Sequence, residues 1–594
     1  HVFPRKRSGR HNCGWNDHVK PFKEESIFWH NTWKTLGQPR VGVLFENMRE
    51  AKKQYMYAVR RLKRQQRELK NEKFALALIE NQTRDFFAEV KKLSPRPNPV
   101  NLMNGVEDET GIANEFCKKY ELLYNSVLSE DIEMDNISDR IQVSVNSIPR
   151  SVDKIIDVNN VKKAVKKLKH CKGDGDIGFN SSHLLYSSNL FYEHLTTAIN
   201  AMFVHGHQAA IVLKATIISI PKDYSKSLCN DSNYRGIALC SSIAKLLDII
   251  VMTRNENALA LSDMQCAFKA KHSTATCTYV VKEVAQYYIN GGSDVYACFL
   301  DATKAFDRVQ FSRLFEVLID RRVHPIDLRL LLDLYKRQSC RTRWKGGTSP
   351  YFSVGNGIRQ GSVISPVLFC AYLDILLLSL EEQKIGCHVG NKFYGCTAYA
   401  DDIVLMSPTL SGLSSMLKQC DEYSQKYHLK FNASKSMCMR FGRSLLTDLP
   451  EIHFSGAPIT WVNQAKHLGN VLTYNLSEQS EINYKRGDLA GRVNSLKAKL
   501  PLTDDSISIK LFTSQCCHLY GCEIWNVCDQ AIKLFVTMHN RSVRRILNLP
   551  YTTHTAYLPC ISGGRPITEQ IHNRISKFSE KLLKKNWPIG KTIF

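Results

Sequence analysis

Three aspartates end or interrupt strongly apolar runs, where a fold can gather negative charge. Asp301 ends the run VYACFLD, and the adjacent Asp401 and Asp402 divide CTAYADDIVLM, a pattern that predicts two strands joined by a tight turn. A strand end and a hairpin tip can bring the three carboxylates to one point. Like-charge repulsion and desolvation oppose that arrangement.

Divalent metal ions would relieve this repulsion. Carboxylate oxygens suit Mg²⁺, which usually binds one or two of them together with substrate phosphates. Two such ions about 4 Å apart activate an attacking oxygen and stabilise a leaving oxygen in phosphoryl transfer. Taken singly, an Asp after a strand is commonly a turn residue, and an Asp-Asp pair commonly lies in a solvated loop.

The composition favours a polyanionic partner, either nucleic acid or an anionic membrane surface. The 594 residues include 80 Lys+Arg and 56 Asp+Glu, a formal net charge of +24, and 43% are hydrophobic, which excludes a disordered chain. No membrane span is expected, because the longest apolar run, residues 367–380, is shorter than the roughly 20 residues required and contains Asp374.

The 19 cysteines indicate reduced thiols of an intracellular protein, because they are scattered and odd in number. The densest group, within residues 516–528, includes His518 but lacks paired zinc-ligand spacing, so core packing is expected there. The chain begins with His1, which suggests a piece of a longer protein.

Hydrophobic periodicity predicts two basic amphipathic helices near the start. Residues 43–92 carry an apolar stripe that includes Leu62, flanked by Arg and Lys, and residues 158–170 repeat the pattern. Each basic face could be solvated or could bind a nucleic-acid backbone. Three prolines predict a linker over 93–105.

The remaining segments predict an α/β or α+β body followed by helices. The acidic stretch 129–140 is expected to be a loop. From residue 214 to 473, strand-like runs alternate with helical ones, and residues 480–594 are mostly helical and basic. Pro366 is expected to break or kink the helix that contains it.

Several blocks resemble a known family. FLDATKAFD, GIRQGSVISPVLF and YADD occur in this order and resemble the A, B and C blocks of reverse transcriptases, most closely those of non-LTR (LINE-type) retrotransposons. An early segment, FWHNTWKTLGQPRVGVLFENMREAKKQY, resembles the part that joins an upstream endonuclease to the polymerase. Further similar segments are 220–254 (fingers), 428–436 (D block), 465–473 (E block or primer grip), and 519–525 with 540–550 (thumb).

The resemblance implies the metal site and a nucleotide gate. Asp301 and Asp401 would bind two Mg²⁺ ions, for which Mn²⁺ could substitute, and Asp402 would complete the site. Phe306 stands where the family has a bulky residue that excludes a ribose 2′-OH and so selects dNTPs. Core packing is the alternative role for its ring.

The resemblance also implies how substrates are held. Lys222 and Arg235 would contact the triphosphate. Gly357, Gln360 and Gly361 belong to a Gly-rich turn, whose small residues would let the backbone approach the template and the nascent base pair. Lys435 matches the family's candidate general acid for pyrophosphate release. Surface charge is the alternative for each of these basic residues.

A tight hairpin is expected in the primer grip. His467, Leu468 and Gly469 would form it and position the primer end.

The implied protein is an RNA-directed DNA polymerase of the α+β class with a right-hand fold. An antiparallel palm sheet would carry the aspartates, between helical fingers and a helical thumb. Its partners would be template RNA, a DNA primer or nicked target, and dNTPs, with no membrane; the nucleus is the expected compartment, and the oligomeric state stays open. The expected divisions are 1–95 (basic helical N-terminal extension), 96–205 (fingers extension), 206–475 (fingers and palm) and 476–594 (thumb).

Departures from the family pattern leave alternatives. QCAFKAKHST resembles the usual Gln-Phe-Gly-Phe-Arg stretch, but Cys266, Ala267 and Lys269 replace three of its residues, which puts template contacts in doubt. No endonuclease, RNase H set or zinc knuckle is evident. A decayed or domesticated reverse-transcriptase fold that only binds RNA, and a group II intron or telomerase-like enzyme, remain as alternatives. An RNA-templated RNA polymerase is opposed by Phe306.

Overall fold

The computed structural model describes residues 15–79, 86–87, 90, 102–127, 129–148, 155–170, 178–445, 448–499, 505–526 and 530–584. The chain forms two compact units. The larger comprises Pro97–Glu481, Gly521–Asp529 and His572–Phe594, and the smaller comprises His1–Arg96, Ile482–Tyr520 and Gln530–Ile571. Within the described ranges, no helix is both long and apolar enough to cross a membrane.

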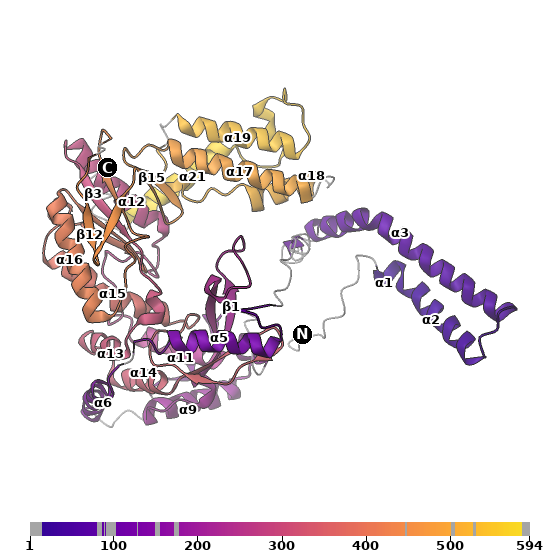
Figure 1. Cartoon of the computed structure of the whole chain (residues 1–594), viewed down its shortest axis with the longest axis horizontal. Coiled ribbons are helices and arrows are strands. Elements are labelled where there is room, and N and C mark those ends of the chain that lie inside the picture. The colour runs from indigo at the N-terminus through magenta and orange to yellow at the C-terminus, as the bar shows by residue number, and fades with distance from the viewer. Residues whose placement is uncertain are drawn as a thin grey trace. The chain divides into compact units, whose positions relative to one another are not determined.

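The larger unit contains a six-stranded sheet in the order β12-β13-β11-β3-β10-β9, of which Figure 1 labels β3 and β12. Neighbouring strands run antiparallel except β11 and β13, which are parallel. The strands are β3 (Val295–Leu300), β9 (Cys396–Tyr399), β10 (Asp402–Ser407), β11 (Met437–Phe441), β12 (Ile452–Phe454) and β13 (Ala457–Trp461).

Helices bury both faces of this sheet. On β3, Cys298 and Leu300 belong to the apolar cluster that includes α15 (Ser365–Glu382) and α16 (Leu410–Tyr427). The alternate residues of β3, such as Phe299, face the cluster that includes α12 (Thr274–Asn290). This double burial explains why the central strands are continuous apolar runs with carboxylates only at their ends.

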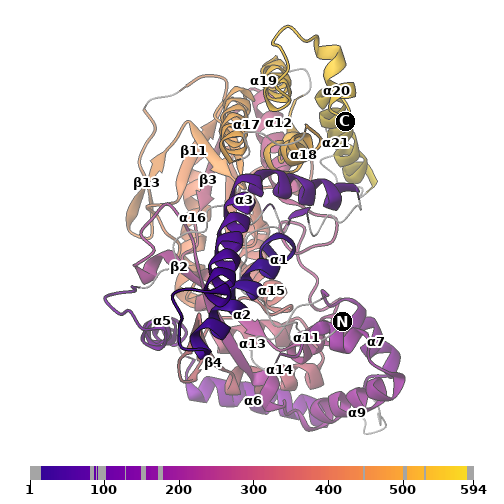
Figure 2. The same ribbon diagram turned by 90° about the vertical axis from the view of Figure 1, so that its right-hand side faces the viewer.

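A second, five-stranded sheet lies in the same unit, with β1 antiparallel to β2 and parallel to β4. Beside it, α6 lies against α13 and α14, and α9 lies against α14 (Figures 1 and 2). The sheet contains β1 (Lys214–Pro221), β2 (Tyr234–Cys240), β4 (Ser339–Trp344), β5 (Gly347–Thr348) and β6 (Phe352–Ser353).

Further helices and two hairpins complete the larger unit. The helices are α5 (Glu109–Leu123), α6 (Asp131–Asn146), α7 (Val158–Lys166), α8 (Ser181–Leu185), α9 (Asn189–His205), α10 (Ala210–Leu213), α11 (Ser242–Arg254), α13 (Phe311–Asp320) and α14 (Pro325–Arg337). The hairpins pair β7 (His388–Val389) with β8 (Lys392–Phe393), and β14 (Gln464–His467) with β15 (Asn470–Thr473).

The smaller unit is helical in its described parts. In it, α2 packs against α3, with Leu62 of the predicted stripe only 2% exposed, and α18 contacts both α3 and α19. Its helices are α1 (Trp15–His18), α2 (Lys20–Thr35), α3 (Val43–Ile79), α17 (Gln479–Lys499, which starts in the larger unit), α18 (Asp505–Leu511), α19 (Ala531–Ile546), α20 (Leu558–Ile561) and α21 (Ile567–Lys584, which ends in the larger unit).

The prediction of a loop over residues 129–140 is wrong, because α6 occupies most of it. Met134, Ile137 and Ile141 recur at helical spacing and are buried, so an apolar face outweighs the acidic composition. The acidic Asp131 and Glu133 lie in the first turn, where the helix dipole favours negative charge.

The expected break at Pro366 is also wrong. α15 begins at Ser365, which places Pro366 in the first turn. Backbone N–H groups in that turn have no intrahelical acceptor, so proline removes no hydrogen bond there. The predicted α+β class is confirmed, while most of the linker predicted over 93–105 lies outside the described residues.

A buried ion pair joins α11 to α14. Arg254 Nε lies 3.1 Å from both carboxylate oxygens of Asp327, whose side chain is 0% exposed, and Asn255 Nδ2 donates to the same carboxylate at 2.8 Å. Arg254 Nη1 also donates to the Ile155 carbonyl at 3.0 Å. The guanidinium therefore compensates the charge of Asp327 and connects three parts of the chain.

We expect Arg254→Met to lower the free energy of unfolding by about 3 kcal/mol, because it leaves the Asp327 carboxylate buried without its cation. The control is Lys336→Met, which removes an ion pair to Asp135 with side chains 35% and 76% exposed and should cost less than about 1 kcal/mol. Urea unfolding followed by fluorescence measures both. Equal losses in the two variants would contradict the assignment.

Candidate active site

The sheet register brings two of the three aspartates opposite each other. Ile403 of β10 pairs with Leu300 of β3, so Asp402 and Asp301, one step beyond that pair, face each other across the end of the sheet. Asp402 also pairs with Tyr399 of β9, which leaves Ala400 and Asp401 as the turn between the strands. The strand end and hairpin tip expected from the apolar runs are both present.

The carboxylates lie close enough to affect each other's titration. Desolvation and the charges of Asp401 and Asp301 raise the pKa of Asp402 to about 6. Desolvation also raises the pKa of Asp401, with a further rise from Asp301, while the Arg235 guanidinium opposes it. Across the described ranges, no three His, Cys, Asp or Glu side chains form a ready metal cage.

The segment 428–436 runs beside Asp301. The Asp301 carbonyl accepts a hydrogen bond from Asn432 N at 2.8 Å, and the Asp301 backbone N–H donates to Ser436 Oγ at 3.1 Å. Lys435 Nζ lies 3.8 Å from Asp301 Oδ2, and its side chain is 67% exposed. The predicted general acid therefore lies beside the carboxylates.

The β1–β2 hairpin presents the two predicted phosphate ligands. Arg235 lies on β2 opposite Ile220, and Lys222 follows the end of β1, where its Nζ donates to the Ser232 carbonyl at 3.1 Å. Desolvation and the nearby cations Lys304 and Arg235 lower the pKa of Lys222. These cations form an electropositive group next to the aspartates.

A buried aspartate that the sequence analysis left without a role supports the block containing Gln360. Asp307, 8% exposed, accepts a hydrogen bond from Gln360 Nε2 at 2.7 Å, and desolvation raises its pKa to about 6. Its place in FLDATKAFD, six residues after Asp301, was the available signal. Asp307 thus links the A block to the B block.

Gly361 packs against β2. Its φ is +134°, and a Cβ there would collide with the Ala238 carbonyl oxygen. The adjacent Gln360 carbonyl accepts a hydrogen bond from Ala238 N at 2.7 Å. In this structure the missing side chain allows close approach to the protein's own strand.

The Phe306 ring is half-buried. It stacks on Phe369 of α15, with ring centroids 4.2 Å apart and planes 19° apart. The Phe306 carbonyl also accepts a hydrogen bond from Ile358 N at 2.9 Å. Packing therefore fixes one face of the ring, and the part that stays accessible could contact a sugar.

The predicted primer-grip residues form a tight turn between β14 and β15. His467 pairs with Asn470, and Leu468 and Gly469 between them adopt φ values of +47° and +84°. The His467 side chain is buried, with its ring 5.5 Å from that of Phe299, so it packs into the core. Of these residues, Leu468 and Gly469 remain half-exposed at the tip.

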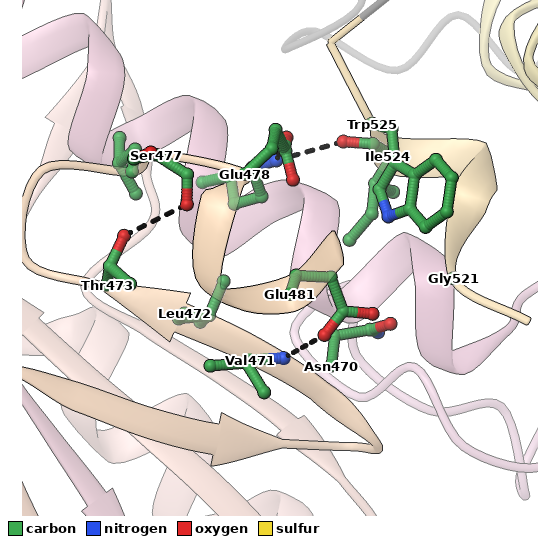
Figure 3. Close-up of a pocket in the computed structure, with 12 residues that line it drawn as sticks. Asn470, Val471, Leu472, Thr473, Ser477, Glu478, Glu481, Gly521, Ile524 and Trp525 are labelled. Carbon is green, nitrogen blue, oxygen red and sulfur yellow. Dashed lines mark hydrogen bonds and ion pairs between the residues drawn. The ribbon is translucent and has the colours of Figure 1, made fainter. Parts of the chain in front are cut away.

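A small pocket behind this hairpin contains a network of charged groups (Figure 3). Lys282 of α12 pairs with Glu478 at 2.5 Å and donates to the Ile524 carbonyl at 2.9 Å. Glu481 accepts a hydrogen bond from Val471 N of β15 at 2.7 Å. These contacts hold the hairpin against α12 and the segment around Ile524.

Cysteines from the dense group pack as expected, since Cys516 and Cys522 are buried. Cys528 lies outside the described residues.

His467 should make stability depend on pH. Burial lowers its folded-state pKa to about 4, from 6.5, so the unfolded chain binds the proton first as pH falls. Stability should therefore fall between about pH 6.5 and 4, by about 2 kcal/mol at pH 5. Thermal unfolding at pH 7.5 and 5 should show a smaller acid loss for His467→Gln than for the wild type. The exposed His572, changed to Gln, is the control, and equal acid losses would contradict the assignment.

Residues 220–482 match the family described as reverse transcriptase (RNA-dependent DNA polymerase). The RNA-directed DNA polymerase from mobile element jockey of Drosophila funebris is 22% identical over 445 residues, which are 72% of this chain and 48% of that protein. The probable RNA-directed DNA polymerase from transposon X-element of Drosophila melanogaster is 23% identical over 386 residues, 62% of this chain and 41% of that protein.

A retrovirus-related Pol polyprotein from the type-2 retrotransposable element R2DM of Drosophila melanogaster is 27% identical over 221 residues, 37% of this chain and 21% of that protein. A solved structure of apo telomerase from Candida Tropicalis, truncated from the C-terminal domain, overlaps 49% of this chain and 60% of that chain at 12% identity and a TM-score of 0.32. This chain spans about half or less of the length of these curated relatives.

The order of the A, B and C blocks, the carboxylates at the ends of β3 and β10, and the matched region agree with each other. The predicted family and fold class are therefore confirmed. Residues 220–482 of this chain are a reverse transcriptase domain, related to the polymerases of non-LTR retrotransposons.

Proposed function

We propose that this chain is the RNA-directed DNA polymerase of a non-LTR retrotransposon. One observation carries the proposal: Asp301 and Asp402 face each other across the sheet end, Asp401 occupies the adjoining turn, and Arg235 lies near enough to offset the charge of Asp401. Carboxylates beside a cationic group suit a substrate that carries phosphates and divalent metal.

The reaction joins a nucleotide to a primer. The primer 3′-oxygen attacks the α-phosphorus of a dNTP in line, the bond to the β-phosphate oxygen breaks, and pyrophosphate leaves. Lys222 and Arg235 would hold the triphosphate, Arg235 through a bidentate fork and Lys222 as a point charge. Lys435, beside Asp301, would give a proton to the leaving pyrophosphate while the 3′-hydroxyl proton passes to solvent.

By the chemistry of their oxygens, the aspartates suit a pair of divalent ions, with Mg²⁺ proposed and Mn²⁺ as a substitute. Their oxygens are hard ligands, and the pKa of Asp402 is raised by desolvation and by the charges of Asp401 and Asp301, so a nearby cation would favour its ionised form. Asp301 and Asp401 would hold the ions and Asp402 would complete the set. When bound, the ions activate the attacking oxygen and stabilise the leaving one.

The template strand is proposed to follow a basic groove next to Gly361. Lys167, Lys169 and Lys245 line this groove together with the apolar Ile249 and Val363. Ammonium groups attract phosphates, and apolar side chains suit unpaired bases. We propose template RNA as the occupant and nicked DNA as the primer, which makes the nucleus the working compartment.

Asp401→Asn should reduce primer extension by roughly 100-fold or more, because the carboxylate charge that holds metal is lost. The assay extends an oligonucleotide on an RNA template with dNTPs and Mg²⁺, and RNA binding should stay near wild type. Asp139→Asn, on the exposed side of α6, is the control and should extend normally. Substantial primer extension by the Asp401→Asn variant would contradict the assignment of Asp401 as a metal ligand. If the wild-type protein binds RNA but does not extend the primer, the decayed, RNA-binding alternative is favoured.

Phe306→Ala should relax selection against ribonucleotides by roughly tenfold or more, because the ring that would meet a 2′-OH is gone. Phe306→Tyr keeps the ring and its stack on Phe369, and should keep the selection. The measurement is the ratio of kcat/KM for dNTP and rNTP. An unchanged ratio in Phe306→Ala would assign the ring to packing alone.

A further inference from the structure

The segment 264–267 forms an additional edge beside β9. Ala398 N donates to the Met264 carbonyl at 2.9 Å, and Cys266 N donates to the Ala398 carbonyl at 2.8 Å. Gln265 and Ala398 are bridge partners in parallel orientation. The segment that resembles Gln-Phe-Gly-Phe-Arg therefore contacts the strand leading into the hairpin of Asp401.

The Gln265 side chain reaches the turn of that hairpin. Its Oε1 accepts hydrogen bonds from Ala400 N and from Ala267 N, each at 3.0 Å, and Gln265 is 0% exposed. Ala400 directly precedes Asp401 and is 7% exposed, so its N–H is shielded from water. Without this acceptor the amide would be buried and unpaired, which native structures avoid.

The turn needs such support because of its backbone conformation. Ala400 has φ of +57°, a left-handed conformation in which the Cβ of an L-residue crowds the following carbonyl. A non-glycine residue stays there when its surroundings enforce it. The hydrogen bond from Ala400 N to Gln265 is a direct restraint on this residue.

We propose that Gln265 is a positioning residue for the catalytic hairpin, acting through Ala400 to hold the Asp401 carboxylate where the reaction needs it. The role in catalysis rests on the proposed function, whereas the restraint on the turn does not. The replacements in the same block fit this structural role: Cys266 and Ala267 are buried, and Lys269 Nζ donates to the Ser262 carbonyl at 2.9 Å.

A conservative substitution of Gln265 can keep the hydrogen bonds that restrain the turn. Gln265 Nε2 is buried and has no hydrogen-bond partner within the described part of the chain, so both observed bonds use Oε1. Gln265→Glu keeps that acceptor in the protonated form, which burial beside the aspartates favours, and loses no donor contact. Gln265→Met keeps the length of the side chain and removes the acceptor.

A buried glutamine elsewhere provides the matched control. Gln208 is 3% exposed, and its Nε2 donates to the Leu330 carbonyl at 2.8 Å. Gln208→Met removes one buried hydrogen bond from the helical part of the larger unit. It should lower thermal stability without affecting the hairpin.

The experiment combines hydrogen exchange over residues 398–404 with steady-state primer extension. In Q265M, exchange of the hairpin amides should rise about tenfold through easier local opening. Its kcat should fall about tenfold with the KM for dNTP within about threefold of wild type, as expected for a displaced catalytic group. Q265E should restore both readouts, and Q208M should change neither.

If the hairpin amides of Q265M exchange at the wild-type rate, the proposal is wrong. It is also wrong if Q208M shows the same fall in kcat as Q265M. If Q265M does not fold, Gln265→Asn, which withdraws the acceptor by one methylene, takes its place and should behave the same way. If wild-type protein fails to extend primers, the proposed function fails, yet the exchange comparison still decides whether Gln265 restrains the turn.

Discussion

The antiparallel pairing of β3 with β10 is the constraint on which the site depends. It places Asp301 opposite Asp402, and it places the turn that contains Asp401 at the same end of the sheet. The pairing is stabilised by apolar side chains on both faces of the sheet, which pack under α12, α15 and α16. Burial of those strands thus opposes the mutual repulsion of the carboxylates at their ends.

Residues around the three carboxylates offset their repulsion or hold them in place, some by direct interaction and others from farther away. Lys435 pairs with Asp301, and Arg235 lowers the cost of charge on Asp401. Farther out, Asp307 ties Gln360 to the A block, and Gln265 holds the turn through Ala400. The carboxylates still carry more negative charge than these cations offset, and divalent metal ions that arrive with the substrate phosphates could balance it.

The sequence predicted what local patterns determine. Apolar runs ending in Asp gave the strands and the hairpin, and the glycine after Leu468 fits its tight turn. What failed depends on context: α6 folds because a sparse apolar stripe finds a partner surface in α13 and α14, which composition does not reveal. Burial of the His467 ring and the reach of Gln265 to Ala400 are contacts between distant segments, and no spacing in one sequence encodes them.

The parallel pairing of β1 with β4 has a consequence for synthesis of the chain. Lys214 lies beside Ser339, and β2, α11, α12 and β3 are all made between these two strands. Neither sheet can close until distant segments emerge from the ribosome, since β3 must wait for β10 and later for β11. During that interval both edges of β3 and the face that packs under α15 and α16 are uncovered, which makes it the kind of segment that aggregates or requires a chaperone.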